Sequence, residues 1–434
     1  MNRIMCLFVI LLHGFGAFAS SVAVIDSGTD FSHQLLQNRA LVNENEIADN
    51  RVDDDANGKV DDVWGWNIVE NYGKVFAPAH LQWIDSLTYR LFDIIARIQE
   101  GTASEKDREF FEDNFQNLPD KRRKKVAGQL NFFGQYAHGT HVSGVVALQS
   151  PSAEILALRV FPDTPPEILN SFGPLAQAQG VKDVIYGLLA TLTNGTFHQA
   201  SDYLLEREID IANMSLGVPL AALAEQFLKL TGNQNPTPEQ IQKETKKLFE
   251  QYRGHAKEWM ANSPDTLFVL AAGNDGQNND RLPTFPAAVS APNKITVAAS
   301  HGQNSLAEFS NFGKNSVEVA APGVAIRSSV PHLNRERMMG MSGTSMAAPY
   351  VSGVAAAVKA EAPALRPQQV KTILMKTVDK KDWLEGRVAS SGLVNAERAL
   401  RAAELSHDVS LSAAIREARR QVADQQASFT GLGC

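Results

Sequence analysis

Cysteine is almost absent from this chain. Its 434 residues include two cysteines, Cys6 and Cys434, which lie at opposite ends of the sequence. We expect Cys6 to be removed with an N-terminal segment, so no internal disulfide is expected. Cys6 also precedes the N-terminal apolar run, whereas a lipid-attachment cysteine would follow it. For Cys434, an intermolecular disulfide is the alternative to an inert terminal thiol.

Long apolar runs are missing as well. The run at 7–18 is shorter than the roughly 20 residues that a spanning helix needs, and histidine and glycine interrupt it. It follows Arg3 and ends in Ala-Phe-Ala, which predicts a signal peptide over residues 1–19 with cleavage after Ala19. We therefore expect a secreted or periplasmic protein with no membrane attachment after cleavage. An uncleaved anchor is the alternative.

The chain has no excess of positive charge. Lysine and arginine total 41 against 48 aspartate and glutamate residues, and the net charge of −7 argues against a nucleic-acid partner. The densest basic cluster, at 121–125, is interpreted as a solvated face or loop, with a self-cleavage site as the alternative. Hydrophobic residues at 44% and charged residues at 21% are ordinary for a globular protein and exclude a disordered chain or a membrane channel.

What the sequence does contain is an alternation of short apolar runs and helical patterns. The runs have the length of β-strands and are apolar on both faces: 22–25, 155–161, 209–214, 267–272, 294–298 and 317–320. This alternation predicts an α/β fold in which helices cover a mostly parallel sheet. In such sheets, functional sites lie at the carboxyl ends of the strands.

Two segments with helical spacing interrupt the alternation. In 78–131 apolar residues recur three or four positions apart, and in 219–263 the pair Thr237 and Gln240 is typical of a capping box. We expect both segments to be helical insertions that pack on the rim of the main domain, because each apolar stripe needs a surface to bury against. A C-terminal helix and tail is expected over 404–434.

A serine surrounded by small residues is the first candidate catalytic group. Ser345 lies in the run Ser-Gly-Thr-Ser-Met-Ala-Ala-Pro, which is typical of a helix N-terminus. The unpaired N–H groups and the helix dipole there favour a developing negative charge. Serine needs an adjacent base to become a nucleophile. Taken alone, this motif would be interpreted as a plain helix cap.

Candidates for that base and its orienting group occur earlier in the chain. His138, in Ala-His-Gly-Thr-His, is expected at a helix start where its ring would face a cleft. With His141 it could instead bind a metal, but no acidic partner accompanies the two histidines. Asp26 ends an apolar strand, where it could accept the histidine N–H and fix its tautomer. Asp30 is nearby but lies past the turn.

The order Asp, His, Ser and the three local sequences resemble the subtilisin-like serine proteases, the subtilase family. Further segments match that family in order: 211–217 resembles the strand that pairs with substrate, 270–276 the segment of the oxyanion asparagine, and 309–313 and 319–324 the sheet segments before the nucleophile. The resemblance covers residues 22 to about 403 outside the two insertions. It implies a three-layer peptidase domain over 20–403.

The resemblance also implies an activity, serine endopeptidase, with polypeptide substrates. In that family's mechanism His138 would take the proton of Ser345 and return it to the leaving amine, with Asp26 holding the imidazole. The side chain of Asn274 and the backbone N–H of Ser345 would stabilise the oxyanion.

Further residues are implied to bind substrate. Ser215, Leu216 and Gly217 would pair with the substrate as an added strand. Thr284 would form the floor of the specificity pocket, where the family often has glycine. A threonine there shortens the pocket and argues against a strong aromatic preference.

Oxygen-bearing residues alternate around a glycine turn within 43–67. The EF-hand motif is excluded because Trp64 stands where its glutamate is required. The segment resembles an acidic loop of many bacterial subtilisin-like enzymes, which implies a structural calcium ion; an acidic surface turn is the alternative. The candidate ligands are Asp53, Asp55, Asn57 and Asp61.

The sequence departs from the family before Asp26. Six residues, 20–25, would precede Asp26 after cleavage, whereas the family normally has a longer lead-in and a folding propeptide. Either the insertions or a separate folding or inhibitory chain would take over that role, or the start of the chain is misassigned. We hypothesise that 78–131 gates the cleft.

Three other functions compete with a broad endopeptidase. A catalytically silent binding module would keep the fold without the chemistry. A sedolisin-type peptidase would need a glutamate in the role of His138. A dedicated processing protease would act on one partner substrate.

Overall fold

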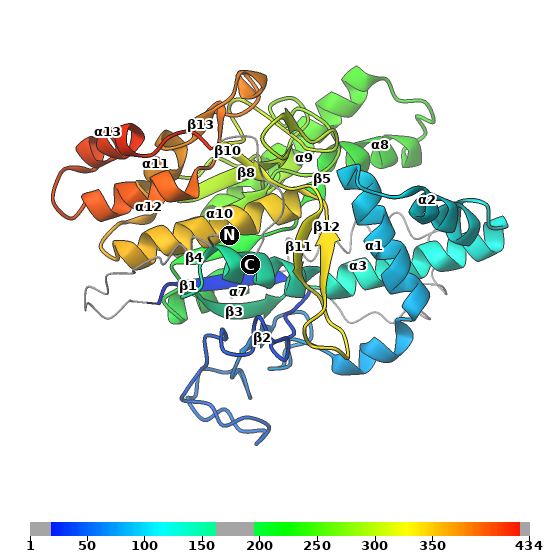
Figure 1. The fold of residues 1–434 in the computed structure, drawn as a ribbon, viewed down its shortest axis with the longest axis horizontal. Helices are drawn as coiled ribbons and strands as arrows, with labels where there is room; N and C mark the ends of the chain where they lie inside the picture. Colours follow the sequence, from blue (N-terminus) through cyan, green and yellow to red (C-terminus); the bar gives the residue numbers. More distant parts are fainter. Residues whose placement is uncertain (1–18, 162–194, 426–434) are drawn as a thin grey trace, which may run out of the picture.

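A largely parallel sheet forms the centre of the protein (Figure 1). The computed structural model describes residues 19–161 and 195–425. The ten strands lie in the order β13-β14-β10-β8-β6-β4-β1-β3-β2, with β9 paired to β8. Within this sheet, β9 and β13 are the only described strands that run antiparallel to their neighbours. The strands are β1 (Ser21–Asp26), β2 (Gly65–Asn67), β3 (Glu154–Arg159), β4 (Ile211–Met214), β6 (Leu267–Ala271), β8 (Lys294–His301), β9 (Ser305–Leu306), β10 (Val319–Pro322), β13 (Asp379–Lys380) and β14 (Gly392–Leu393).

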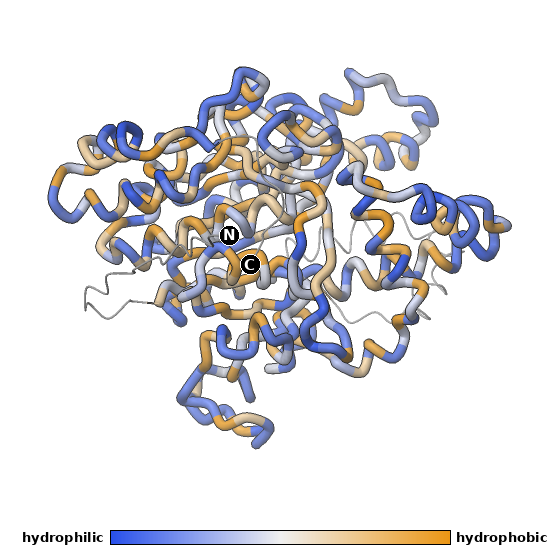
Figure 2. The backbone as a smooth tube through the Cα atoms, viewed as in Figure 1, coloured by the Kyte–Doolittle hydropathy of each residue, from blue (hydrophilic) through white to orange (hydrophobic). Residues whose placement is uncertain are grey.

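The sheet separates two hydrophobic cores. Along β1, Val22 and Val24 face one core, whereas Ala23 and Ile25 face the other. Such strands are apolar on both sides because both faces are covered. Figure 2 shows apolar residues gathered along the sheet and α10 (Thr344–Glu361), with polar residues on the outer turns. These observations confirm the expected three-layer α/β fold.

Helices cover both faces. One core contains side chains from α3 (Asp120–Gln149), α10, α11 (Pro367–Lys376), α12 (Ala396–Leu405) and α13 (Leu411–Gln421). The other contains side chains from α7 (Thr196–Glu206), α8 (Leu220–Leu230) and α9 (Pro238–Asn262). Two antiparallel strand pairs lie outside the main sheet: β5 (Val218–Pro219) with β7 (Thr284–Phe285), and β11 (Ile326–Ser329) with β12 (Met338–Met341). No helix among the described residues is both long and apolar enough to cross a bilayer.

The segment 78–131 is helical, as expected, but its last helix continues into the main domain. It contains η1 (Pro78–Trp83), α1 (Ser86–Glu100), α2 (Glu105–Phe111), η2 (Glu112–Gln116) and the start of α3. The basic residues 121–125 are exposed on the first turns of α3, in line with a solvated helix face. Helix α1 packs against both α3 and β12 (Figure 1).

The segment 219–263 forms α8 and α9. The predicted capping box is present: the Thr237 hydroxyl accepts from the Gln240 N–H, and the Gln240 side chain accepts from the Thr237 N–H. We expected the whole segment to pack on the rim of the main domain, and only the outer part of the α8–α9 pair does so. The last turns of α9 belong to the core, because Trp259 and Met260 are fully buried beneath the sheet.

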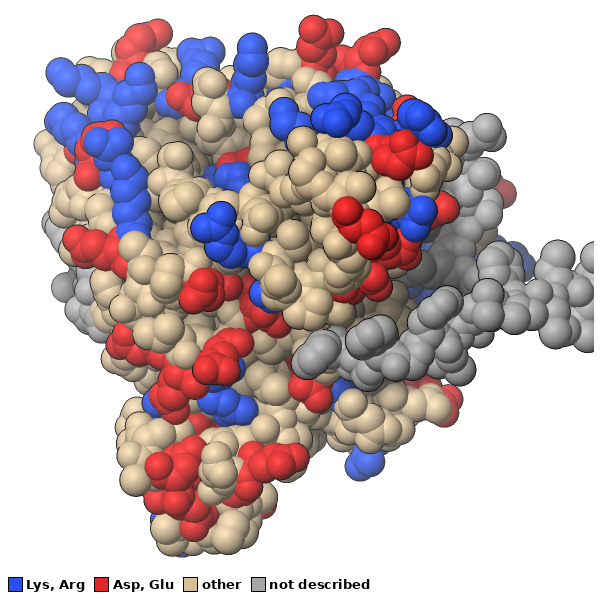
Figure 3. Space-filling model, turned by 90° about the vertical axis from the view of Figure 1, so that its left-hand side faces the viewer, with Lys and Arg blue, Asp and Glu red and all other residues tan. Residues whose placement is uncertain are grey.

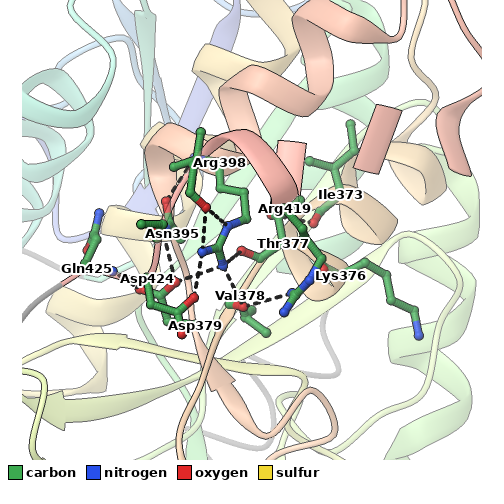
Figure 4. A network of polar contacts seen from close by, with 12 residues as sticks. Ile373, Lys376, Thr377, Val378, Asp379, Asn395, Arg398, Arg419, Asp424 and Gln425 are labelled. Atoms are coloured by element: carbon green, nitrogen blue, oxygen red, sulfur yellow. Dashed lines mark hydrogen bonds and ion pairs between the residues drawn. The ribbon is translucent and has the colours of Figure 1, made fainter. Parts of the chain in front are cut away.

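The C-terminal part of the chain forms two helices, α12 and α13, and the helix expected within 404–434 is α13. Arg398 of α12 is a buried arginine whose side chain contacts two distant segments, 377–379 and 422–424 (Figure 4). It binds the carboxylate of Asp379 at 2.9 Å, that of Asp424 at 2.6 Å and the carbonyl of Val422. Helix α13 is therefore tied to the main domain. The predicted signal segment, apart from Ala19, and Cys434 lie outside the described residues.

Candidate active site

Four predicted residues from separate elements line one cavity of about 860 Å³. Asp26 is the last residue of β1, and Asn274 follows β6. Ser345 is the second residue of α10, and His138 lies in α3. The cavity therefore occupies the carboxyl ends of the central strands, where sites of parallel sheets are expected.

His138 is held by Asp26. The imidazole Nδ1 lies 2.7 Å from Asp26 Oδ1, and the aspartate is fully buried. A carboxylate only accepts hydrogen bonds, so Nδ1 carries the proton and Nε2 of the neutral ring is available as a base. Burial works against a charge on His138, but the attraction and hydrogen bond of Asp26 outweigh it and raise the pKa of the imidazole.

The predicted position of His138 at a helix start is wrong. It is an interior residue of the 30-residue helix α3. The ring still reaches the cavity because Gly139, the next residue, packs against the turn after β1: a Cβ on Gly139 would lie 2.2 Å from the Gly28 carbonyl oxygen. The glycine thus brings α3 and the strand end close enough for the contact between His138 and Asp26.

Ser345 stands at the N-terminus of α10, as predicted. Its hydroxyl donates to the Ser215 carbonyl at 3.2 Å, and the Ser215 hydroxyl donates to the Ser345 carbonyl at 2.8 Å. Within the described residues, a hydrogen bond between Ser345 and His138 is not formed. Catalytic hydrogen bonds are often long in structures without substrate. Rotation about the Cα–Cβ bond of Ser345 is the simplest motion that would redirect its hydroxyl.

Asn274 is oriented by Thr344. Its Oδ1 accepts from both the N–H and the hydroxyl of Thr344, each at 2.9 Å. The amide nitrogen is consequently the atom left to donate, and no acceptor among the described residues is bonded to it. Asn274 is exposed at the cavity, so a ligand can reach this nitrogen.

The predicted substrate-binding residues also line the cavity. Ser215, Leu216 and Gly217 follow β4, and Thr284 lies in β7. The Thr284 hydroxyl is fixed by hydrogen bonds with the side chains of Asn279 and Asn311. Its methyl group would lie 3.1 Å from a Cβ at Gly217, so threonine narrows the cavity here.

His141, one turn after His138, is not arranged as a metal ligand. Its Nε2 contacts the carbonyls of Ile326 and Met339 at 2.9 and 3.0 Å, which ties α3 to both strands of the β11–β12 hairpin. Burial lowers the pKa of His141 to about 3, so the ring is neutral at ordinary pH. These contacts support a structural role.

The acidic loop brings together a different carboxylate set from the predicted one. Glu46, Asp55 and Asp62 place oxygens within 4.8 Å of one another, and Glu46 and Asp62 are buried. Of the predicted carboxylate ligands, only Asp55 belongs to this group, and the predicted Asn57 lies beside it, with its side-chain amide donating to Asp55 and Asp62. Asp53 instead accepts from the N–H groups of Asn57 and Gly58, and Asp61 accepts from those of Asn50 and Arg51. Figure 3 shows acidic side chains gathered on the lobe that projects at the lower edge of the molecule.

The sequence placed the first insertion at the cleft but did not identify which of its residues line the cavity. Phe92, Ile95 and Ala96 of α1 line the cavity with Met341 of β12. The spacing of apolar residues in 78–131 had indicated a helix, but this spacing does not indicate which distant segment the helix contacts. Glu46 and Asp62 were missed for the same reason.

Comparison with known proteins shows the family of the chain. The sequence matches the Subtilase family over residues 19–398. It is 28% identical to M-protease of Shouchella clausii over 64% of this chain and 58% of that protein, and 28% identical to Subtilisin Savinase of Lederbergia lenta over 64% of this chain and 82% of that protein. A crystal structure of a cold-adapted subtilisin-like serine proteinase is 18% identical, with a TM-score of 0.48 over 91% of this chain and 95% of that one. Because the family match spans most of the sequence, the chain belongs to the subtilase family.

Proposed function

We propose that this protein is a serine endopeptidase that hydrolyses polypeptides through an acyl-enzyme intermediate. The observation that carries the proposal is the 2.7 Å contact between His138 and Asp26 in the cavity that Ser345 also lines. This contact fixes the imidazole so that its second nitrogen can act as the base. Membership of the subtilase family supports the same reaction.

The first step forms the acyl-enzyme. Ser345 Oγ attacks the scissile carbonyl carbon as its proton passes to His138 Nε2. The carbonyl oxygen becomes an anion, which Asn274 Nδ2 and the Ser345 N–H stabilise by donating hydrogen bonds. The tetrahedral carbon then expels the amine, which takes the proton from His138, and the peptide C–N bond is broken.

The second step releases the acyl product. Water takes the place of the departed amine and gives its proton to His138 while its oxygen attacks the ester carbon. The bond between the acyl carbon and Ser345 Oγ breaks, and the proton returns to the serine. In both steps, the charge that develops on His138 is stabilised by the buried carboxylate of Asp26.

The acyl part of the substrate is proposed to pair with Ser215, Leu216 and Gly217 as an added strand. Leu216 and Gly217 follow the end of β4 and line the cavity. Thr284 narrows the cavity beside Gly217, so we expect small or medium side chains before the scissile bond.

Hydrolysis of a peptide library tests this function. The wild-type protein should cleave internal peptide bonds, and Ser345→Ala should abolish turnover while leaving the fold intact, because the alanine removes only the hydroxyl. Cleavage by Ser345→Ala at the wild-type rate would contradict the proposal. Casein cleavage would separate a broad endopeptidase from a dedicated processing protease, which should leave casein intact.

We also propose that Glu46, Asp55 and Asp62 hold a structural calcium ion. Calcium prefers oxygen ligands, and three carboxylates this close repel one another unless a cation compensates their charge. The rest of the ligand shell would come from carbonyl groups and water. Bound calcium would tie the acidic loop together.

Thermal unfolding tests the calcium proposal. Calcium at 100 times its dissociation constant should add about 2.7 kcal/mol to the free energy of unfolding. Asp62→Asn should remove most of this response. Asp53→Asn, which alters a turn within the same loop, should retain it. Equal calcium responses in the wild type and Asp62→Asn would contradict this ligand set.

Export is a further part of the proposal. The charged and apolar pattern of residues 1–19 supports a secreted or periplasmic location. N-terminal sequencing of the exported protein should find Ser20 as the first residue.

A further inference from the structure

Three of the four α1 residues that line the cavity are apolar, and the fourth is the exposed Gln99. Phe92 and Ile95 are half-buried and line the cavity, and Ala96 and Met341 lie beside them. The ring of Phe92 meets that of Phe133 edge to face, with centroids 4.9 Å apart. Half-buried apolar side chains facing a cavity lose their remaining contact with water when an apolar ligand group covers them.

This wall is attached to the β11–β12 hairpin by polar contacts. Arg337, which precedes β12, binds Asp93 of α1 at 2.6 Å, and the Tyr89 hydroxyl donates to the Pro331 carbonyl at 3.0 Å. Helix α1 also lies directly on the hairpin, because a Cβ on Gly340 would come within 2.9 Å of the Ala96 Cβ. These contacts favour a fixed wall over the gate that we hypothesised from the sequence.

Helix α3 connects the same wall to the catalytic base. Asn131, Gly134 and Gln135 line the cavity at helical spacing before His138, so they share its face of α3. The Phe92 ring packs over Gly134, because a Cβ at this position would lie 3.6 Å from the ring. The apolar wall therefore begins one helical turn from His138.

The chemistry indicates which part of the substrate lies against this wall. His138 must deliver its proton to the leaving amine, so the leaving segment passes next to the His138 ring. The acyl segment is assigned to Ser215, Leu216 and Gly217. The wall formed by α1 and β12 stands beside α3, the helix that carries His138 (Figure 1), and is thus placed for the leaving segment.

We propose that Phe92, Ile95 and Met341 form a binding subsite for an apolar side chain on the leaving-group side of the scissile bond. The inference rests on the proposed endopeptidase function and adds a specificity that the catalytic residues do not provide. It gives the insertion 78–131 a role in substrate selection.

Cleavage of peptides that vary only in the first two residues after the scissile bond tests the subsite. We expect kcat/KM to favour leucine, methionine or phenylalanine over aspartate or serine at one of these positions by about tenfold or more. Ile95→Asn and Phe92→Ala should each reduce that preference severalfold. Preferences before the scissile bond should stay as in the wild type.

Ile98→Asn is the matched control, because Ile98 is a half-buried residue of the same helix that does not line the cavity. It should retain the wild-type preference. An unchanged preference in Ile95→Asn and Phe92→Ala, or a change confined to residues before the scissile bond, would overturn the subsite. Labelling of Ser345 by a small fluorophosphonate, which carries no peptide leaving segment, reports on the catalytic function separately. A wild-type protein that does not label would refute the endopeptidase function instead.

Discussion

At the scale of single residues, the site depends on side chains that each have one polar atom fixed and another left for the substrate. Asn274 shows this most clearly, because Thr344 occupies its oxygen and leaves the nitrogen to donate. His138 follows the same rule, with Nδ1 bound to Asp26. Such prior orientation reduces the rearrangement needed when charge develops in the transition state.

Replacing Asn274 tests its role in oxyanion stabilisation. We expect Asn274→Ala to lower kcat by about 10²- to 10³-fold with a small effect on KM, because the lost hydrogen bond forms mainly in the transition state. Steady-state kinetics with a peptide substrate measures both constants. Asn304→Ala, at an exposed asparagine in the turn between β8 and β9, should have no effect. A rise in KM with kcat unchanged would assign Asn274 to ground-state binding.

His141 makes the stability of the fold depend on pH. Its folded-state pKa of about 3 lies below its ordinary value of 6.5, so the unfolded chain binds the extra proton first as the pH falls. The free energy of unfolding should therefore fall as the pH drops from about 6.5 towards 3, by at most about 1.4 kcal/mol per pH unit from this group.

The variant His141→Gln isolates this contribution. Glutamine can still donate to the Ile326 or Met339 carbonyl but does not titrate. Denaturant unfolding between pH 4 and 7 should give a shallower pH dependence for the variant than for the wild type. Parallel curves for the two proteins would show that His141 does not control stability in this range.

At the scale of elements, α3 shows what sequence patterns miss. The sequence suggested an insertion ending at residue 131 and a separate helix beginning at His138, because the small residues after His138 resemble a helix start. One helix spans 120–149 instead, and no proline interrupts it between Pro119 and Pro151. The insertion and the catalytic base consequently belong to one rigid element.

The C-terminal helices are joined to the domain by Arg398. The arginine is 2% exposed, and its partner Asp379 is fully buried. Arg398→Met would leave that carboxylate without its cation, which typically costs about 3–5 kcal/mol. Denaturant unfolding should show this loss. Arg401→Ala, which breaks the solvent-exposed pair with Glu404 on the same helix, should cost less than about 1 kcal/mol. Similar losses in both variants would contradict a special role for Arg398.

At the scale of the whole molecule, the sequence predicted the sheet and the four main site residues because each belongs to a recognisable pattern of neighbouring residues. Buried strands such as β1 carry apolar residues on both faces, and Asp26 and Ser345 lie at element ends that their neighbours identify. The residues of the cleft wall and of the carboxylate cluster could not be predicted in this way. Asp93 and Arg337 are 244 positions apart, and Asp62 meets Glu46 only after the loop has folded. Contacts of this kind depend on the tertiary fold.

The proposed mechanism requires Ser345 to be an activated nucleophile. Stoichiometric labelling by a fluorophosphonate measures this directly, because the probe reacts with a serine whose proton a base removes. We predict one label per molecule on Ser345 in the wild type, and none in either Ser345→Ala or His138→Ala. A folded wild-type protein that takes no label, as expected of a silent binding module, or equal labelling in His138→Ala, would contradict the account.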